Sequence, residues 1–178
     1  EANEPEDSQQ IASINADHIE KKADFEAGYF ASYHAYPYYP EYINNKYSSD
    51  NYAQYLAELQ SIHQLPILIA EFGVPSSRGK AHESAQSKRD QGFLSEIEQG
   101  TAIKELFNDI VDQGLMGGLI FSWQDEYFKR TWNTKDYDTP SRRPYWADLQ
   151  TNEQFFGLLN FDARAIKNIY IDGAADGW

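Results

Sequence analysis

The stretch Pro66-Ile-Leu-Ile-Ala-Glu71 decides the fold of this chain. Its apolar residues follow one another without alternation, which is typical of a parallel strand buried on both faces. The run ends on a carboxylate, and burying a charge costs free energy unless partners hold it. We therefore expect a buried parallel strand that presents Glu71 at its carboxyl end.

Two further strands are expected on either side of this run. The aromatic segment 28–36 predicts a strand that ends before Pro37, and Gly117-Gly-Leu-Ile-Phe-Ser-Trp123 predicts a third, buried strand. Both are rich in the apolar and aromatic residues that favour strands.

Two helices are expected between the strands. Apolar residues at three- and four-residue spacing predict one helix from an Asp50 N-cap to about His63. Ser95-Glu-Ile-Glu98 is a capping-box signature, and it predicts a second helix that ends at Gly114. The alternation of strands and helices favours parallel βαβ units with right-handed crossovers. A short helix or turn is expected within 151–161.

Long segments follow the predicted strands, whereas the returns from helix to strand are short. The long ones are 37–49, 72–94 and 124–150, and the short returns are 64–65 and 115–116. In parallel α/β folds the functional groups gather where the strands end. We therefore expect a site at this end of the sheet.

The composition excludes several classes of function. The chain has 15 Lys+Arg against 28 Asp+Glu, which gives a formal net charge of −13. This acidic balance argues against nucleic-acid binding and against contact with an anionic membrane surface. The absence of cysteine excludes disulfides and thiolate chemistry. With no phosphate-binding loop, nucleophile-elbow serine or His-x-x-x-His spacing, no cofactor and no metal are expected.

Glu71 is the strongest candidate for catalysis, because a nucleophilic carboxylate must be fixed, partly shielded and ionised by nearby donors. His34 and Tyr36 are separated by one residue, so they share a face of their strand and are expected to bind Glu71 or a sugar hydroxyl. For His34 the alternative is a satisfied core histidine. For Glu71 the alternative is a strand-end carboxylate bonded to backbone or to an arginine.

The aromatic content, 15% of the chain, favours carbohydrate binding, since Tyr and Trp offer flat apolar faces with a polar edge. Trp123 is expected to form the floor of a sugar subsite, with core filling as the alternative. Gln124 and Glu126 follow it and are expected to bind sugar hydroxyls. For the carboxylates Asp125 and Glu126 the alternatives are an acid in catalysis or a solvated loop charge. Arg78 and His82 are expected to close over the site.

Three segments together resemble strands six, seven and eight of the clan A retaining glycoside hydrolases. They are Phe30-Ala-Ser-Tyr-His-Ala-Tyr-Pro37, Ile69-Ala-Glu-Phe-Gly73 and Gly118-Leu-Ile-Phe-Ser-Trp123. The resemblance implies an α/β fold, the C-terminal portion of a TIM (β/α)8 barrel. It also implies that Glu71 is the nucleophile, that Trp123 ends strand eight, and that His34 and Tyr36 line the cleft. The segments around residues 71–79, 123–129 and 142–146 resemble a group of uncharacterised bacterial barrel proteins.

One part of the clan pattern is not matched. In that clan the acid/base glutamate follows an asparagine at the end of strand four, but Asn3-Glu4 lies in an acidic coil with no strand before it. A retaining mechanism needs two carboxyl groups roughly 5 Å apart, and a full barrel takes about 250 residues. The chain is therefore expected to be a fragment, inactive alone, that is accompanied by the rest of the barrel or by a second copy.

The expected organisation has three parts. Residues 1–27 are an acidic connector, 28–162 are the barrel portion, and 163–178 resemble the opening of a carbohydrate-binding β-sandwich module. For the last segment the alternative is a final edge strand of the barrel domain. An extracellular or cell-surface location is favoured. The expected function is a retaining glycosidase or transglycosidase that acts on a polysaccharide. The alternatives are a non-catalytic carbohydrate-binding barrel that serves polysaccharide synthesis or attachment, and a purely structural α/β domain.

Overall fold

The centre of the structure is a parallel sheet of three strands. The computed structural model describes residues 25–39, 43–47, 49–129 and 152–160. The sheet has the order β1 (Ala31–His34), β2 (Ile67–Phe72) and β3 (Gly117–Ile120), and both pairings are parallel. The predicted order and direction of these three strands are thus confirmed, and β2, which carries Glu71, is the central strand.

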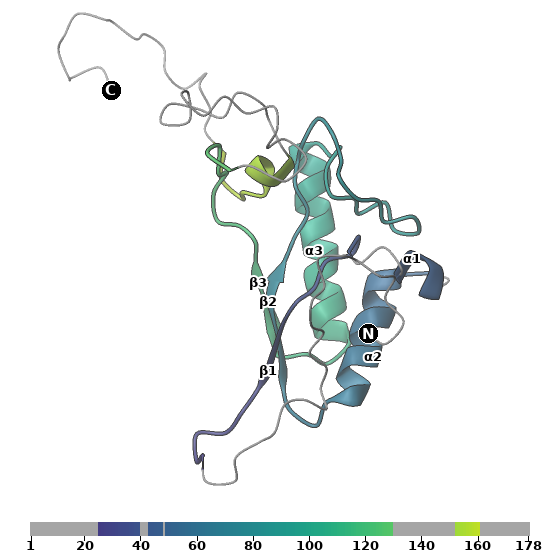
Figure 1. Cartoon of the computed structure of the whole chain (residues 1–178), viewed down its shortest axis with the longest axis vertical. Coiled ribbons are helices and arrows are strands. Elements are labelled where there is room, and N and C mark those ends of the chain that lie inside the picture. Colours follow the sequence, from purple (N-terminus) through teal and green to yellow (C-terminus); the bar gives the residue numbers. More distant parts are fainter. Residues whose placement is uncertain (1–24, 40–42, 48, 130–151, 161–178) are drawn as a thin grey trace, which may run out of the picture.

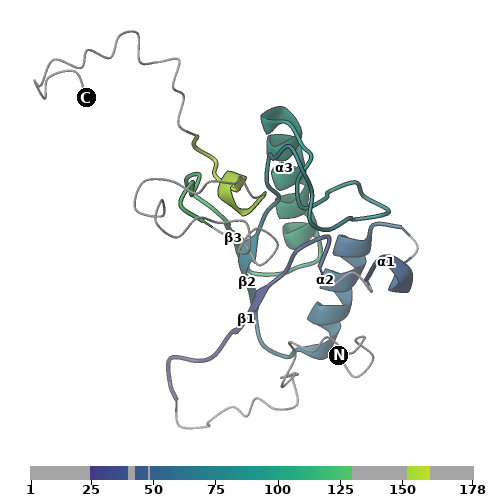
Figure 2. The ribbon, with the colours of Figure 1, turned by 45° about the horizontal axis from the view of Figure 1, so that its top comes forward.

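Two long helices lie on the same side of this sheet (Figures 1 and 2). They are α2 (Asn51–Ile62), which connects β1 to β2, and α3 (Glu96–Asp112), which connects β2 to β3. A one-turn helix, α1 (Ile43–Lys46), precedes α2, and a 3-10 helix, η4 (Asn152–Phe155), lies near the end of β3. The described residues therefore form two layers, one of helices and one of sheet.

The helices begin where their sequences predict. The Asp50 side chain accepts a hydrogen bond of 3.2 Å from the backbone N–H of Ala53, which satisfies one of the free donors at the start of α2. At the start of α3, Ser95 and Glu98 form the expected capping box. Gly114 follows the end of α3 with φ 78°, a backbone conformation that glycine adopts without strain.

The core lies between the sheet and the helices. Ile67, Ile69 and Phe72 of β2 are fully buried against this layer. Gly118 of β3 allows α3 to approach closely, because a Cβ at this position would lie 2.7 Å from the Phe72 ring and 2.9 Å from Ile110 Cδ1. From the helices the core takes the apolar side chains of Tyr52, Leu56, Leu59, Ala102, Ile103, Leu106 and Ile110.

The structure corrects several expectations about these elements. The first and third strands were expected at 28–36 and 117–123, but they span Ala31–His34 and Gly117–Ile120, so Trp123 lies beyond the end of its strand. The third strand was expected to be buried, but Leu119 and Ile120 are 56% and 38% exposed. The reason is that the described helices cover only one face of the sheet (Figure 1). The segment 37–49 was expected to be a loop, but it contains α1.

Parts of the expected organisation fall outside the description. The proposed β-sandwich opening at 163–178 and residues 1–24 of the acidic connector lie outside the described residues, as does 130–151 of the segment after β3. Within the described ranges, no helix is both long enough and apolar enough to cross a membrane.

Candidate functional site

Glu71 lies at the carboxyl end of the central strand. In the pairing of β1 with β2 it is opposite His34, after a shift of register that follows Tyr33. Such an irregularity re-aims the side chains that follow it. The Glu71 side chain is 32% exposed, so the carboxylate is partly shielded from water but can be reached from outside.

Two side chains contact the same oxygen of this carboxylate. The Tyr36 hydroxyl donates a hydrogen bond of 2.9 Å to Glu71 Oε2, and His34 Nδ1 lies 3.1 Å from the same atom. The His34 side chain is 62% exposed, so it approaches Glu71 from the solvent side. The arrangement fixes one carboxylate oxygen and leaves Oε1 outside both contacts.

Tyr36 is suited to remain a hydrogen-bond donor. Burial, and after it the negative charge of Glu71, raise the pKa of the Tyr36 hydroxyl well above its usual value. Because deprotonation would place two negative charges side by side, the hydroxyl stays protonated across the neutral range. Tyr36 therefore keeps the proton that it donates to Glu71 across the neutral range.

Aromatic rings surround Tyr36. Its ring centroid is 5.5 Å from that of Tyr38 and 6.3 Å from that of Phe156. His82 stacks on Tyr38 at 6.2 Å, and Phe121 meets Phe156 edge-on at 5.1 Å. Tyr36 thus reaches Glu71 from within a packed aromatic cluster, which restricts the directions its hydroxyl can take.

The segment after β3 supplies a different set of groups. Trp123 is 71% exposed, so it does not fill the core. Gln124 is also exposed, and it forms an isolated parallel bridge with Leu159. Glu126 is paired with Lys129 at 3.0 Å, and Lys129 also lies 3.5 Å from Glu153.

The predicted site residues separate into two groups. His34, Tyr36 and Glu71 are brought together, and His82 joins them indirectly through Tyr38. The structure gives no contact between Glu71 and the remaining predicted residues: Arg78, which is exposed on the loop after β2, and Trp123, Gln124 and Glu126.

Sequence reasoning missed the residues that support this site from a distance. Tyr38 and Phe156 pack around Tyr36, and Lys129 lies 4.2 Å from the Phe121 ring centroid. The high aromatic content near the strand ends was a signal for Tyr38. Phe156 is far from β1 along the chain, and no local pattern predicts its contact with Tyr36.

Among the hollows on the described part of the surface, two are lined by residues other than Glu71. One, of about 380 Å³, is lined by Asp50, Gln86, Ser87, Arg89, Glu105, Asn108 and Asp109. The other, of about 300 Å³, lies against the first turns of α3 and includes Glu96, Gln99, Asp125 and Leu158. Among the residues that the structure describes, no group of three or more His, Asp or Glu is arranged to hold a metal ion.

Comparison with models of protein families, with curated proteins and with solved structures finds no match. Around Glu71 the structure provides a partly shielded carboxylate and a hydrogen-bond donor that stays protonated. The segment after the neighbouring strand β3 adds the exposed aromatic face of Trp123, which does not contact Glu71.

Proposed function

We propose that this chain is part of a retaining glycosidase or transglycosidase that acts on a polysaccharide, with Glu71 as the nucleophile. The observation that carries the proposal is the placement of Glu71 at the end of the central parallel strand, held by Tyr36 and His34 on one oxygen. A nucleophile has to be fixed in position while one oxygen stays available for attack. Here Tyr36 and His34 both contact Oε2 of Glu71, so Oε2 is held in position and Oε1 stays available for attack.

In the proposed reaction, an oxygen of Glu71 attacks the anomeric carbon of a sugar. The glycosidic C–O bond breaks, and the leaving oxygen takes a proton from a general acid. The resulting ester between Glu71 and the sugar is then cleaved when water, or a hydroxyl of another glycan, attacks the same carbon and gives its proton to the group that acted as the acid in the first step. Tyr36 and His34 orient Glu71 in both steps, and the Tyr36 hydroxyl stabilises the carboxylate when it is released.

The sugar itself would be held by groups after β3. The exposed indole of Trp123 offers a flat apolar surface for the C–H face of a sugar ring. Gln124 and Glu126 are proposed to bind sugar hydroxyls, and Arg78 and His82 to line the approach from the loop after β2.

The acid/base carboxylate is proposed to come from additional strand–helix units. Parallel sheets are generally covered on both faces, whereas here Leu119 and Ile120 are exposed, and the described helices lie on one side. A barrel that continues from both edges of this sheet would cover this face and would bring a second carboxyl group to roughly 5 Å from Glu71. On this account the 178 residues alone bind sugar weakly and do not hydrolyse it.

The experiment is to replace Glu71 by glutamine in the longest natural polypeptide that contains this chain. We expect turnover of the glycan substrate to fall by at least about 10³-fold, with binding kept, because the amide cannot form the ester. Glu105→Gln, the same chemical change on an exposed turn of α3, is the matched control and should leave turnover unchanged.

The same experiment separates the second candidate, a non-catalytic carbohydrate-binding barrel. The exposed Trp123 favours this candidate as much as the first, since a stacking platform serves binding without chemistry. A protein of that kind shows no turnover with Glu71 present, and it binds glycan equally well with glutamine in its place.

A further inference from the structure

The backbone on both sides of Tyr36 is held by two consecutive side chains. Asn51 Nδ2 donates a hydrogen bond of 2.8 Å to the carbonyl of Pro37, and the Tyr52 hydroxyl donates one of 3.2 Å to the carbonyl of Ala35. Both residues belong to the first turn of α2, and both are fully buried. The one residue between the two held carbonyls is Tyr36, which reaches Glu71.

These two hydrogen bonds, from Asn51 to the Pro37 carbonyl and from Tyr52 to the Ala35 carbonyl, form a bracket around Tyr36. The bracket holds the chain where the backbone pairing of β1 with β2 ends. β1 ends at His34, and the last backbone bond to β2 runs from the N–H of Ala35 to the carbonyl of Glu71 at 3.0 Å. Beyond that bond, Tyr36 forms an isolated antiparallel bridge with Tyr39, and the chain around it is also held by hydrogen bonds from the side of α2. Asn51 and Tyr52 supply two such bonds within one turn of helix.

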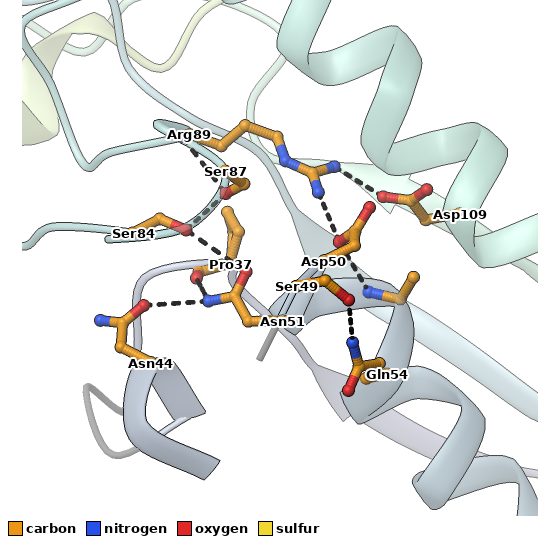
Figure 3. Close-up of polar contacts among 11 residues, drawn as sticks. Pro37, Asn44, Ser49, Asp50, Asn51, Gln54, Ser84, Ser87, Arg89 and Asp109 are labelled. Atoms are coloured by element: carbon orange, nitrogen blue, oxygen red, sulfur yellow. Dashed lines mark hydrogen bonds and ion pairs between the residues drawn. The ribbon is translucent and has the colours of Figure 1, made fainter. Parts of the chain in front are cut away.

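The bracket is in turn fixed by the loop that follows β2. Ser84, which is buried, lies 3.4 Å from Asn51 Oδ1 and donates to it, and Asn44 accepts from Asn51 Nδ2 at 3.1 Å (Figure 3). The Asn51 amide therefore has partners for its donor and its acceptor atoms. Since an amide held in this way has one orientation, its bond to the Pro37 carbonyl is directed.

Arg89 locks the same helix turn from the other side. Its guanidinium lies 2.7 Å from Asp50, the N-cap of α2, and 2.6 Å from Asp109 of α3 (Figure 3). It also lies 5.9 Å from the centroid of the Tyr52 ring. Its side chain is almost entirely buried. The start of α2 is thereby tied to α3 and to the loop after β2, so the bracket around Tyr36 has a rigid base.

We propose that Asn51 and Tyr52 are positioning residues that set the Tyr36 hydroxyl on the Glu71 carboxylate. The significance of this assignment for catalysis rests on the proposed function of Glu71. Misplacement of a catalytic contact by about 1 Å can cost about 10²-fold in rate, and a bracket on either side of residue 36 opposes such a shift. A purely structural role, in which Asn51 and Tyr52 only satisfy buried carbonyls, would affect stability and leave the Tyr36 contact unchanged.

The test measures hydroxyl exchange of Tyr36 directly, in the full chain. Tyrosines labelled with ¹³C at Cζ are recorded by NMR in mixed H₂O and D₂O, where the exchange rate of each hydroxyl proton is read from its own ¹³C signal. The Tyr36 signal is assigned by its loss in Tyr36→Phe. Tyr47, whose hydroxyl donates to Glu58, is the internal reference in every spectrum.

The first variant is Tyr52→Phe, which removes only the hydroxyl on Ala35 and keeps the buried ring. We expect Tyr36 hydroxyl exchange about tenfold faster, which corresponds to the loss of one directed hydrogen bond, with the Tyr47 rate unchanged. The second variant, Asn51→Ala, should act in the same direction. Asn45→Ala, the same change at an exposed position of α1, is the matched control and should leave both rates as they are.

An unchanged Tyr36 rate in Tyr52→Phe, with Tyr47 also unchanged, overturns the proposal. If Asn51→Ala also speeds the hydroxyl exchange of Tyr47, that variant has lost its fold. The Tyr36 exchange rate in Tyr52→Phe, which preserves the core volume, then decides whether the proposal stands. The measurement involves no glycan and no turnover. A failure of Glu71→Gln to affect hydrolysis would therefore defeat the glycosidase proposal and leave this one standing, and the reverse also holds.

Discussion

Replacing Arg89 by methionine removes the cation that joins the start of α2 to α3. The guanidinium has two carboxylate partners, Asp50 at 2.7 Å and Asp109 at 2.6 Å. The side chain of Asp109 is 19% exposed and that of Asp50 is 45% exposed. Because water reaches Asp109 less easily, most of the lost stability comes from leaving the Asp109 carboxylate without its cation. Methionine keeps much of the buried volume, and the change therefore tests the charge more than the packing.

The magnitude follows from which carboxylate is left without its partner. Removing one member of a buried ion pair costs about 3–5 kcal/mol. The lower end of that range applies here, because Asp109 is half-buried at the edge of a surface hollow and the exposed Asp50 is rehydrated at little cost. We therefore expect a loss of about 3 kcal/mol in the free energy of unfolding at pH 7. The double variant Arg89→Met with Asp109→Asn should recover about half of it, because the unpaired buried charge is gone.

The stability lost in Arg89→Met should be larger at neutral pH than at acidic pH. Burial raises the pKa of Asp109 above its ordinary value, and Arg89 holds it down in part. A raised pKa means that the folded state favours the protonated form, so this contribution to stability is present at low pH and is lost as pH rises through the folded pKa. Without Arg89 the pKa of Asp109 rises further. The deficit of the variant should thus be largest at pH 7 and smaller near pH 4.

Urea unfolding of both proteins at the two pH values measures these quantities. Arg78→Met, the same change at an exposed position of the same loop, is the control and should cost less than about 0.5 kcal/mol. Two results would contradict the role assigned to the Arg89–Asp109 pair: a free energy of unfolding of Arg89→Met within about 1 kcal/mol of the unsubstituted chain at pH 7, or a deficit that does not shrink on acidification.

Three further changes test the packing. Gly118→Ala should destabilise the chain by about 2 kcal/mol, because the new methyl group would lie against the Phe72 ring and Ile110, whereas Gly79→Ala, with open space around it, should be near neutral in the same thermal melts. Ser95→Ala should lower the free energy of unfolding by about 1 kcal/mol through loss of the α3 cap, and an unaltered urea midpoint would count against the capping box. Leu119→Asp should change the stability of this chain by less than about 0.5 kcal/mol, since the side chain is exposed, but should cost about 2 kcal/mol or more in the natural polypeptide if additional strands cover that face. If Leu119→Asp changed the stability of this chain and of the natural polypeptide equally, the proposal that additional strands cover this face would be contradicted.

Local patterns predicted much of the fold. The Asp50 cap, the Ser95 capping box and the glycine after α3 each depend on a few neighbouring residues, so they can be recognised in the sequence. The proximity of His34 and Tyr36 to Glu71 was also predictable, since the carboxyl ends of parallel strands meet at one edge of a sheet.

Contacts between distant segments were not predictable from one sequence. The bond from Asn51 to the Pro37 carbonyl, the pairing of Arg89 with Asp109 and the packing of Phe156 on Tyr36 join residues whose proximity depends on the whole fold. The exposure of Leu119 has the same origin, because an apolar strand does not reveal whether one or both of its faces are covered.

The most direct test of the central claim is to trap the covalent intermediate. The natural polypeptide is incubated with a panel of activated 2-deoxy-2-fluoro glycosides, which form the sugar ester quickly and release it slowly, and the digested protein is examined by mass spectrometry. We predict one sugar adduct, on the peptide that contains Glu71, and none in Glu71→Gln. An adduct on a different carboxylate, or glycan turnover with inversion at the anomeric carbon, would contradict the account.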